Sequence, residues 1–191
     1  LEEKYGIHSL IMADGPAGIR LQQSYEVDRQ TDTVYGVGVL GSLENGFLLP
    51  ETKQHEGADT YYQYCTAFPV GTALAQTWNL ELMHEFGRAI AVEMEEFHVD
   101  LWLAPGMNIH RNPLCGRNFE YYSEDPLLSG MIAAAVTSGV QGNGTCGVTI
   151  KHFACNNQED NRMGVNVCIS ERALREIYFR GFEIAVEEGA P

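Results

Sequence analysis

The chain has 191 residues, of which 45% are hydrophobic, so it can bury a core and falls within the size range of one domain. Acidic residues outnumber basic ones by 26 to 12, giving a formal net charge of -14, and no run of Lys or Arg interrupts this surplus. Nucleic acid and anionic membrane are therefore poor partners, and no stretch approaches the ~18 apolar residues of a membrane span.

The first predicted strand covers residues 7–14, IHSLIMAD. This apolar run ends at Asp14 and is followed by a Gly-Pro turn and then by Arg20. From residue 22 to 64 the sequence is rich in Gly, Thr, Asp and Tyr and shows no sustained period. We expect residues 22–64 to be an irregular insertion, and loops of that length are usually functional or mobile.

A helix is predicted for residues 79–97, where Asn79 can cap the first turn and apolar residues recur at helical spacing. A short apolar strand, residues 100–105, follows and is stopped by a proline. The next helix begins after Asp125, which precedes a proline, and ends near Gly139.

The last two predicted elements are a strand at residues 146–151 and a helix that Ser170 caps and Gly189 stops. Strands and helices thus alternate along the chain. This order implies a parallel sheet, either in a barrel or in a doubly wound sheet.

Polar clusters follow all three strands, as the strand-to-helix loops of a barrel should, and this favours the barrel. A complete barrel needs ~250 residues, so three units predict an incomplete one. The predicted fold is α/β: a partial (β/α)8 TIM-type barrel, roughly the first half, in which residues 1–191 form one incomplete barrel domain with a long insertion after the first strand. The chain lacks a starting Met and stops just after a helix, so we expect both ends to lie within a longer chain.

Several short motifs have ordinary explanations. Two G-x-G-x-x-G matches, residues 36–41 and 142–147, lack the strand-then-helix context that phosphate binding requires, so no dinucleotide or other cofactor is predicted. The Asn143-Gly-Thr sequence is read as a turn rather than a glycosylation site. The six histidines show no metal-ligand spacing, so no metal site is predicted. The five scattered cysteines favour free thiols, and on that basis alone a cytoplasmic location.

The polar residues at the strand ends form the candidate site. Taken alone, Lys151 and His152 could be a solvated lysine beside a core histidine, and the other charges could be ordinary ion pairs. A barrel, however, brings all strand ends onto one rim, and a fixed carboxylate with several donors suits a sugar ring, whose hydroxyls both donate and accept hydrogen bonds. The candidate set is Asp14, Arg20, Arg117, Lys151 and His152.

Nearby aromatic residues could supply apolar faces for such a ring, although aromatics beside a strand are more often core. These residues are Trp102, Phe119, Tyr121 and Tyr122.

Three long motifs carry a resemblance to a known family: MADGPAGIR at residues 12–20, NIHRNPLCGRNFEYYSEDP at 108–126 and KHFACNNQE at 151–159. In order and spacing they resemble successive blocks of the catalytic barrel of family 3 glycoside hydrolases, particularly its β-glucosidases. The segment FPVGTALAQTWN, residues 68–79, is similar to the stretch between the first two blocks. The resemblance covers most of the chain outside residues 22–64.

The resemblance implies that Asp14 accepts hydrogen bonds from the hydroxyls of the sugar to be released, and that Arg20, Arg117, Lys151 and His152 donate to or line the same subsite. It implies a retaining hydrolase that releases terminal β-D-glucose, or a related sugar such as xylose, from β-linked substrates. The nucleophilic Asp and the acid/base would lie outside residues 1–191. The remainder of a parent polypeptide would then be a necessary partner.

A second hypothesis remains open beside this one. The chain could be a non-catalytic carbohydrate-binding or interaction module that keeps the sugar pocket and lacks the nucleophile. Reading the parent gene downstream for an Asp on a later strand would separate the two hypotheses.

Overall fold

The computed structural model describes residues 2–7, 9–35 and 55–189. The G-x-G-x-x-G match at residues 36–41 lies outside them. The chain divides into two compact units, Leu1–Ile19 with Ala67–Pro191 and Arg20–Thr66.

A three-stranded parallel sheet forms the centre of the first unit. Its strands are β1 (Met12–Asp14), β5 (Leu101–Leu103) and β6 (Gly147–Val148), in the order β1-β5-β6. In the register, Ala13 pairs with Trp102, which in turn pairs with Val148. These pairings confirm the predicted α/β class with parallel strands. Each strand is shorter than its predicted apolar run, because only part of the run forms ladder pairs.

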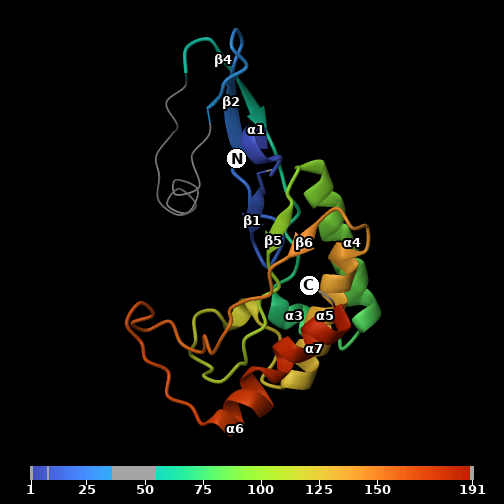
Figure 1. Cartoon of the computed structure of the whole chain (residues 1–191), viewed down its shortest axis with the longest axis vertical. Helices are drawn as coiled ribbons and strands as arrows, with labels where there is room; N and C mark the ends of the chain where they lie inside the picture. Colours follow the sequence, from blue (N-terminus) through green and yellow to red (C-terminus); the bar gives the residue numbers. More distant parts are fainter. Residues whose placement is uncertain (1, 8, 36–54, 190–191) are drawn as a thin grey trace. The chain divides into compact units, whose positions relative to one another are not determined.

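Three helices follow the strands and lie on one side of the sheet (Figure 1). They are α4 (Leu80–Glu96), α5 (Pro126–Gln141) and α7 (Arg180–Gly189). Asn79 accepts the Leu82 N–H at the start of α4, as predicted for an N-cap. Asp125 caps α5 in the same way, accepting from Leu127 N–H at 2.7 Å. The core between sheet and helices contains Met83, Ile90, Met94, Trp102, Ile132, Val136 and Val140.

Helices α4 and α5 approach each other through glycines. A Cβ on Gly87 would lie 2.3 Å from the Val136 carbonyl oxygen, and one on Gly139 would lie 2.2 Å from the His84 carbonyl oxygen. Such distances leave no room for a side chain. Glycine at both positions therefore allows the two backbones to meet.

The last predicted helix is interrupted. Ser170 caps α6 (Glu171–Ala173), as predicted, but a π-helical segment, η2 (Leu174–Tyr178), separates it from α7. Large apolar side chains of this segment are buried only in its second half, where Phe182 is 6% exposed, whereas Ile177 is 38% exposed. Short additional elements are α1 (Glu2–Tyr5), α3 (Gly71–Ala75) and the 3-10 helix η1 (Asn118–Glu120).

The second unit corrects the expectation that residues 22–64 are irregular. Its described part contains an antiparallel sheet in which β2 (Ser24–Asp28) pairs with both β3 (Val34–Tyr35) and β4 (Ala58–Tyr62). Most residues of β4 are exposed. Because neither face of the strand is buried, the sequence lacks the apolar alternation by which a strand is recognised.

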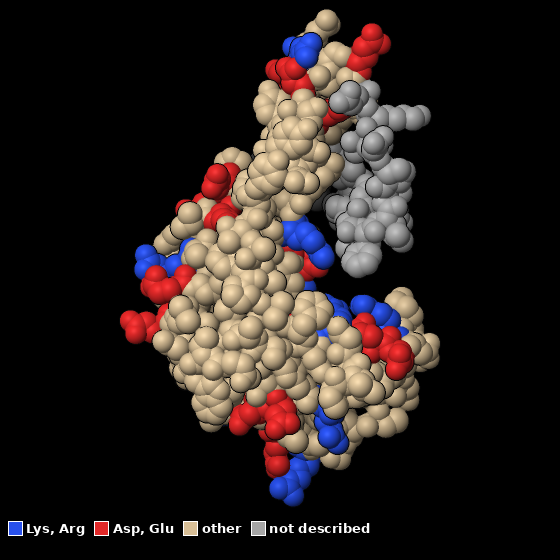
Figure 2. Space-filling view, turned by 180° about the vertical axis from the view of Figure 1, so that it is seen from behind, with Lys and Arg blue, Asp and Glu red and all other residues tan. Residues whose placement is uncertain are grey.

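The described surface carries its basic side chains beside acidic ones. On the face in Figure 2, blue and red residues lie close together, and no broad basic area is visible. Ion pairs account for part of this pattern, among them Arg29–Asp59, Arg88–Glu85 and Arg180–Glu183. Among the described residues, no helix combines the length and the apolar character needed to cross a bilayer.

Candidate functional site

An ion pair joins the ends of the two outer strands of the parallel sheet. Asp14 is the last residue of β1, and Lys151 follows β6 by three positions. Lys151 Nζ lies 2.5 Å from Asp14 Oδ1. The lysine side chain is 13% exposed and that of the aspartate 30%, so the pair is partly withdrawn from water.

The backbone holds Lys151 in register with the segment after β5. Residue 151 forms a parallel bridge with Gly106, its N–H donates to Pro105 O at 3.0 Å, and its carbonyl accepts from Met107 N–H at 2.8 Å. The chain therefore stays paired with the sheet beyond the end of β6. Lys151 leaves the strand at a fixed point, and its side chain reaches over the central strand to Asp14.

His152 is fixed through its backbone and its ring. Asn108 Oδ1 accepts the His152 backbone N–H at 2.7 Å, and Asn108 Nδ2 donates to the His152 carbonyl at 2.9 Å. The ring nitrogen Nδ1 lies 3.1 Å from the Tyr121 hydroxyl. Burial, together with the positive charges of Arg117 and Lys151, lowers the pKa of His152 to about 4. The ring is therefore neutral at pH 7.

Arg117 pairs with Glu120 across η1, through Nε and Oε1. The Glu120 side chain is 3% exposed, whereas that of Arg117 is 21% exposed. Burial opposes the charged guanidinium, but the hydrogen bond and the charge of Glu120 outweigh it, so the pKa of Arg117 is raised. The sequence indicates only that such an ion pair is possible. In the structure the Glu120 carboxylate is buried, and Arg117 is the cation that pairs with it.

A network behind His152 was not predicted. Asn156 Nδ2 donates to the Tyr121 hydroxyl and to Glu159 Oε1, both at 2.8 Å. Arg162 Nη1 donates to the other oxygen of Glu159 at 3.0 Å. The signal in the sequence is the run of amides and acids after Lys151 and His152, which indicates a polar loop without indicating which members meet.

The aromatic residues beside the site are mostly core, so they do not offer ring faces to a ligand. Trp102 and Tyr121 are 0% exposed and Tyr122 is 4% exposed. Trp102 Nε1 donates to Gly15 O at 3.0 Å, which satisfies its one donor inside the protein. Phe119 differs, because it is 52% exposed.

Four of the five predicted site residues lie in the first unit and influence one another. Asp14 contacts Lys151, and the charges of Lys151 and Arg117 act on His152. Arg20 is the first residue of the second unit. Its place in the site stays a prediction.

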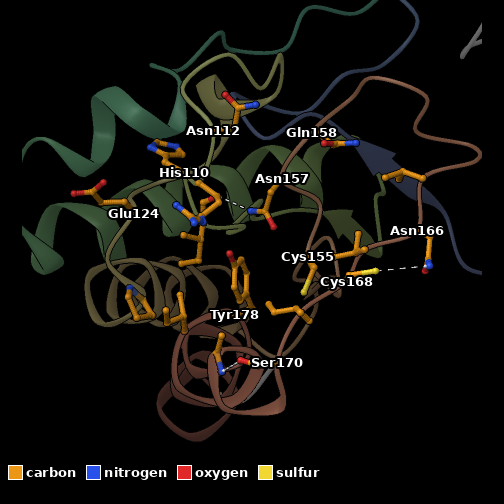
Figure 3. Close-up of a pocket in the computed structure, with 18 of the residues that line it drawn as sticks. His110, Asn112, Glu124, Cys155, Asn157, Gln158, Asn166, Cys168, Ser170 and Tyr178 are labelled. Atoms are coloured by element: carbon orange, nitrogen blue, oxygen red, sulfur yellow. Dashed lines mark hydrogen bonds between the residues drawn. The ribbon is translucent and has the colours of Figure 1, made fainter.

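A separate cleft of about 1150 Å³ lies beside the start of α5 (Figure 3). Its wall includes His110, Asn157, Cys168 and Tyr178, and it includes none of the predicted site residues. Asn157 Nδ2 donates to Ile109 O at 2.7 Å within this wall. The cleft is therefore separate from the site formed by Asp14, Arg117, Lys151 and His152, although the loop after His152 contributes residues both to the cleft and to the network behind His152.

The described residues contain no group of three or more His, Cys, Asp or Glu side chains placed to hold a metal ion. None of the five cysteines, all of which are described, forms a disulfide bond in the structure. The charged and polar side chains at the strand ends supply hydrogen-bond donors and acceptors with fixed charges. Such a set can bind and orient a polyhydroxylated ligand.

Residues 43–191 match the model of the "Glycosyl hydrolase family 3 N terminal domain". Beta-glucosidase A of Butyrivibrio fibrisolvens is 55% identical over 126 residues, covering 66% of this chain and 15% of the relative. An exo-alpha-(1->6)-L-arabinopyranosidase of Bifidobacterium breve (strain ACS-071-V-Sch8b) is 51% identical over 126 residues, covering 66% and 16%. The structure of beta-glucosidase 3B from Thermotoga neapolitana in complex with glucose is 49% identical, with a TM-score of 0.76, and the match covers 97% of this chain and 22% of that one. The chain thus spans less than a quarter of the length of each of these proteins.

Proposed function

The chain belongs to glycosyl hydrolase family 3, and from this premise we propose that its parent protein hydrolyses O-glycosidic bonds and releases terminal, non-reducing β-D-glucose from β-glucosides. This chain supplies the sugar-binding half of the site. The observation that carries the proposal is the Asp14–Lys151 pair at the strand ends, with Arg117 and His152 beside it.

The pair combines the two functions that a sugar hydroxyl requires. Asp14 is an acceptor whose orientation Lys151 fixes, and the ammonium group is a donor with three hydrogens. A hydroxyl placed against both groups can donate to the carboxylate and accept from the ammonium. Charge-assisted hydrogen bonds of this kind are stronger than neutral ones.

The charges also suit the transition state of glycoside hydrolysis. Positive charge spreads over the ring as the bond to the leaving group breaks, and hydrogen bonds to the ring hydroxyls strengthen. A preorganised carboxylate then stabilises this state more than the ground state. Asp14, Arg117, Lys151 and His152 would hold the ring.

The covalent steps in this proposal belong to groups outside residues 1–191. A nucleophilic Asp would attack the anomeric carbon, and a second carboxyl would act as acid and then as base, with net retention. Within the described site, the carboxylates of Asp14, Glu120 and Glu159 are each engaged in an ion pair. Such pairing supports a binding role for them rather than a nucleophilic one.

The parallel β1-β5-β6 sheet is proposed to be the first part of a (β/α)8 barrel that the rest of the parent chain completes. Two observations support this. The strands run parallel in chain order with a helix after each one, and the site residues follow the carboxyl ends of the strands, where barrel enzymes bind their ligands.

The same engaged carboxylates support a second candidate, a non-catalytic carbohydrate-binding module. Hydrolysis by the full-length protein separates the two. The experiment compares aryl β-D-glucoside, aryl β-D-xyloside and aryl α-L-arabinopyranoside, because relatives of this chain carry both glucosidase and arabinopyranosidase names. We expect the β-glucoside to give the highest kcat/KM, and proton NMR to show the β-anomer of glucose as the first product. Sugar binding without turnover of any substrate would instead support the module.

A further inference from the structure

The side chains of Glu159, Asn156 and Tyr121 form a chain of hydrogen bonds that ends at the His152 ring. Glu159 Oε1, Asn156 Nδ2, the Tyr121 hydroxyl and His152 Nδ1 follow one another at 2.8, 2.8 and 3.1 Å. Tyr121 is fully buried, so its hydroxyl proton must find a partner within the protein. The carboxylate at one end of the chain determines which atom is the donor in each of the hydrogen bonds.

An ionised carboxylate only accepts hydrogen bonds, so the atom of Asn156 that faces Glu159 must be its NH2 group. Arg162 Nη1 donates to the second oxygen of Glu159 at 3.0 Å, so both carboxylate oxygens act as acceptors. The same NH2 group faces Tyr121, so the tyrosine oxygen accepts from Asn156. The tyrosine proton is then left to point at His152 Nδ1.

A ring nitrogen that accepts a hydrogen bond carries no proton, so the single proton of a neutral His152 lies on Nε2. The described residues make no hydrogen bond to Nε2, and this atom is not among their buried, unpaired polar atoms. Nε2 therefore keeps some exposed surface, and the His152 side chain as a whole is half-buried. Its N–H is available to a ligand.

We propose that Tyr121 and Asn156 are positioning residues that fix His152 as its Nε2–H tautomer, so that the ring presents a donor to a sugar hydroxyl. The alternative tautomer has an acceptor of its own, because Asn108 Oδ1 lies 3.2 Å from Nδ1. Without the tyrosine proton, Nδ1 could carry the hydrogen and donate it to Asn108. Nε2 would then be an acceptor. Tyr121 and Asn156 therefore select one of two His152 tautomers, each of which has a hydrogen-bond partner for Nδ1.

This inference deepens the proposed function and rests on it for the identity of the ligand, but the tautomer itself can be measured without substrate. Long-range proton–nitrogen NMR of the full-length protein, labelled with ¹⁵N-histidine, distinguishes a protonated ring nitrogen from an unprotonated one. The His152→Asn variant identifies the His152 signals. The test variants are Tyr121→Phe, which removes the donor, and Asn156→Asp, which turns the donor to Tyr121 into an acceptor.

The wild type should show a protonated Nε2. Tyr121→Phe should populate the Nδ1–H form, and Asn156→Asp should favour it more strongly, because Tyr121 would then donate to residue 156. Tyr122→Phe is the matched control, because Tyr122 is buried like Tyr121 but its hydroxyl is not part of this hydrogen-bonded chain, and burial alone raises its pKa. This variant should leave the His152 signals unchanged. An unchanged tautomer in both test variants would overturn the inference.

Measurements of kcat/KM test whether the Nε2–H group of His152 donates a hydrogen bond to the sugar. Both test variants should lower kcat/KM for the aryl β-glucoside about tenfold, as expected for a lost hydrogen bond, while Tyr122→Phe retains wild-type kcat/KM. A changed tautomer with unchanged kcat/KM would show that Nε2–H is not a donor to the sugar. A wild-type protein that shows the Nε2–H tautomer and hydrolyses nothing would contradict the proposed function and leave the tautomer assignment standing.

Discussion

Lys151 Nζ lies 2.5 Å from Asp14 Oδ1, so one ion pair joins the ends of the first and third strands of the parallel sheet across the central strand. The two residues are 137 positions apart in the chain. Their contact depends on the parallel register of β1, β5 and β6, which brings the carboxyl ends of the strands to one edge. The sheet thereby places an acceptor and a donor side by side.

The first prediction is that Asp14 and Lys151 act as a unit. Asp14→Asn and Lys151→Met should each lower kcat/KM of the full-length enzyme for an aryl β-glucoside. The double variant should lose less than the sum of the single effects, with a coupling of about 0.5–3 kcal/mol. The exposed Glu85–Arg88 pair provides the control cycle and should show no coupling in kcat/KM. Additive losses at Asp14 and Lys151 would count against the shared role.

The second prediction separates two roles of Arg117. Arg117→Met leaves the buried Glu120 carboxylate without its partner and should destabilise the protein by about 3–5 kcal/mol. The double change Arg117→Met with Glu120→Gln removes both charges and should recover most of the loss in apparent Tm. If Arg117 also binds the sugar, kcat/KM of the double variant stays low. Full recovery of kcat/KM would show that Arg117 acts only as the partner of Glu120.

The third prediction follows from the pKa of His152, which burial and nearby positive charges lower to about 4. An unfolded histidine titrates near ~6.5, so between these values the folded protein binds fewer protons than the unfolded chain. Stability should therefore fall as the pH falls from about 6.5 to 4. The apparent Tm of His152→Asn should fall less over this range than that of the wild type.

His98→Asn is the matched control for this measurement, because His98 is exposed and asparagine tolerates its positive φ of 55 degrees. This control should follow the wild-type dependence on pH. An identical pH dependence in wild type and His152→Asn would contradict the assignment of a buried, neutral His152.

The fourth prediction concerns the contact between α4 and α5. A Cβ at position 139 would lie 2.2 Å from a backbone oxygen of His84, so Gly139→Ala must push the two helices apart. Overpacking of this kind costs about 1–3 kcal/mol and should lower the apparent Tm of the full-length protein. Gly116→Ala is the control, since nothing lies within 4 Å of the added Cβ. Equal Tm values for the two variants would contradict the close packing.

Much of the first unit could be predicted from the sequence because its elements are buried and capped. The signals at Asn79, Asp125 and Ser170 each correspond to a side chain that caps a helix. The apolar run before Asp14 located the end of β1, whereas β6 ends at Val148, three residues before Lys151. Parallel pairing of the strands then brings Asp14 and Lys151 together. Buried faces and helix caps require particular residue types at particular spacings, so these features can be recognised in the sequence.

The rest could not be predicted because it has no such pattern. The exposed strand β4 buries neither face, so its residues show no apolar alternation. From the sequence, Tyr121 could supply an apolar face for a sugar ring, whereas in the structure its ring is core and its hydroxyl contacts His152. The choice between these roles depends on contacts between residues about thirty positions apart, on which local periodicity carries no information.

The most direct test of the sugar-binding role is the kcat/KM of the Asp14→Ala variant of the full-length protein on an aryl β-D-glucoside. Asp100→Ala is the matched control, because Asp100 precedes β5 and so lies at the opposite end of the same parallel sheet. Loss of a charge-assisted contact to the substrate should cost at least ~1.5 to 3 kcal/mol, a decrease of about tenfold or more, while Asp100→Ala retains wild-type kcat/KM. A folded Asp14→Ala variant with wild-type kcat/KM would contradict the account.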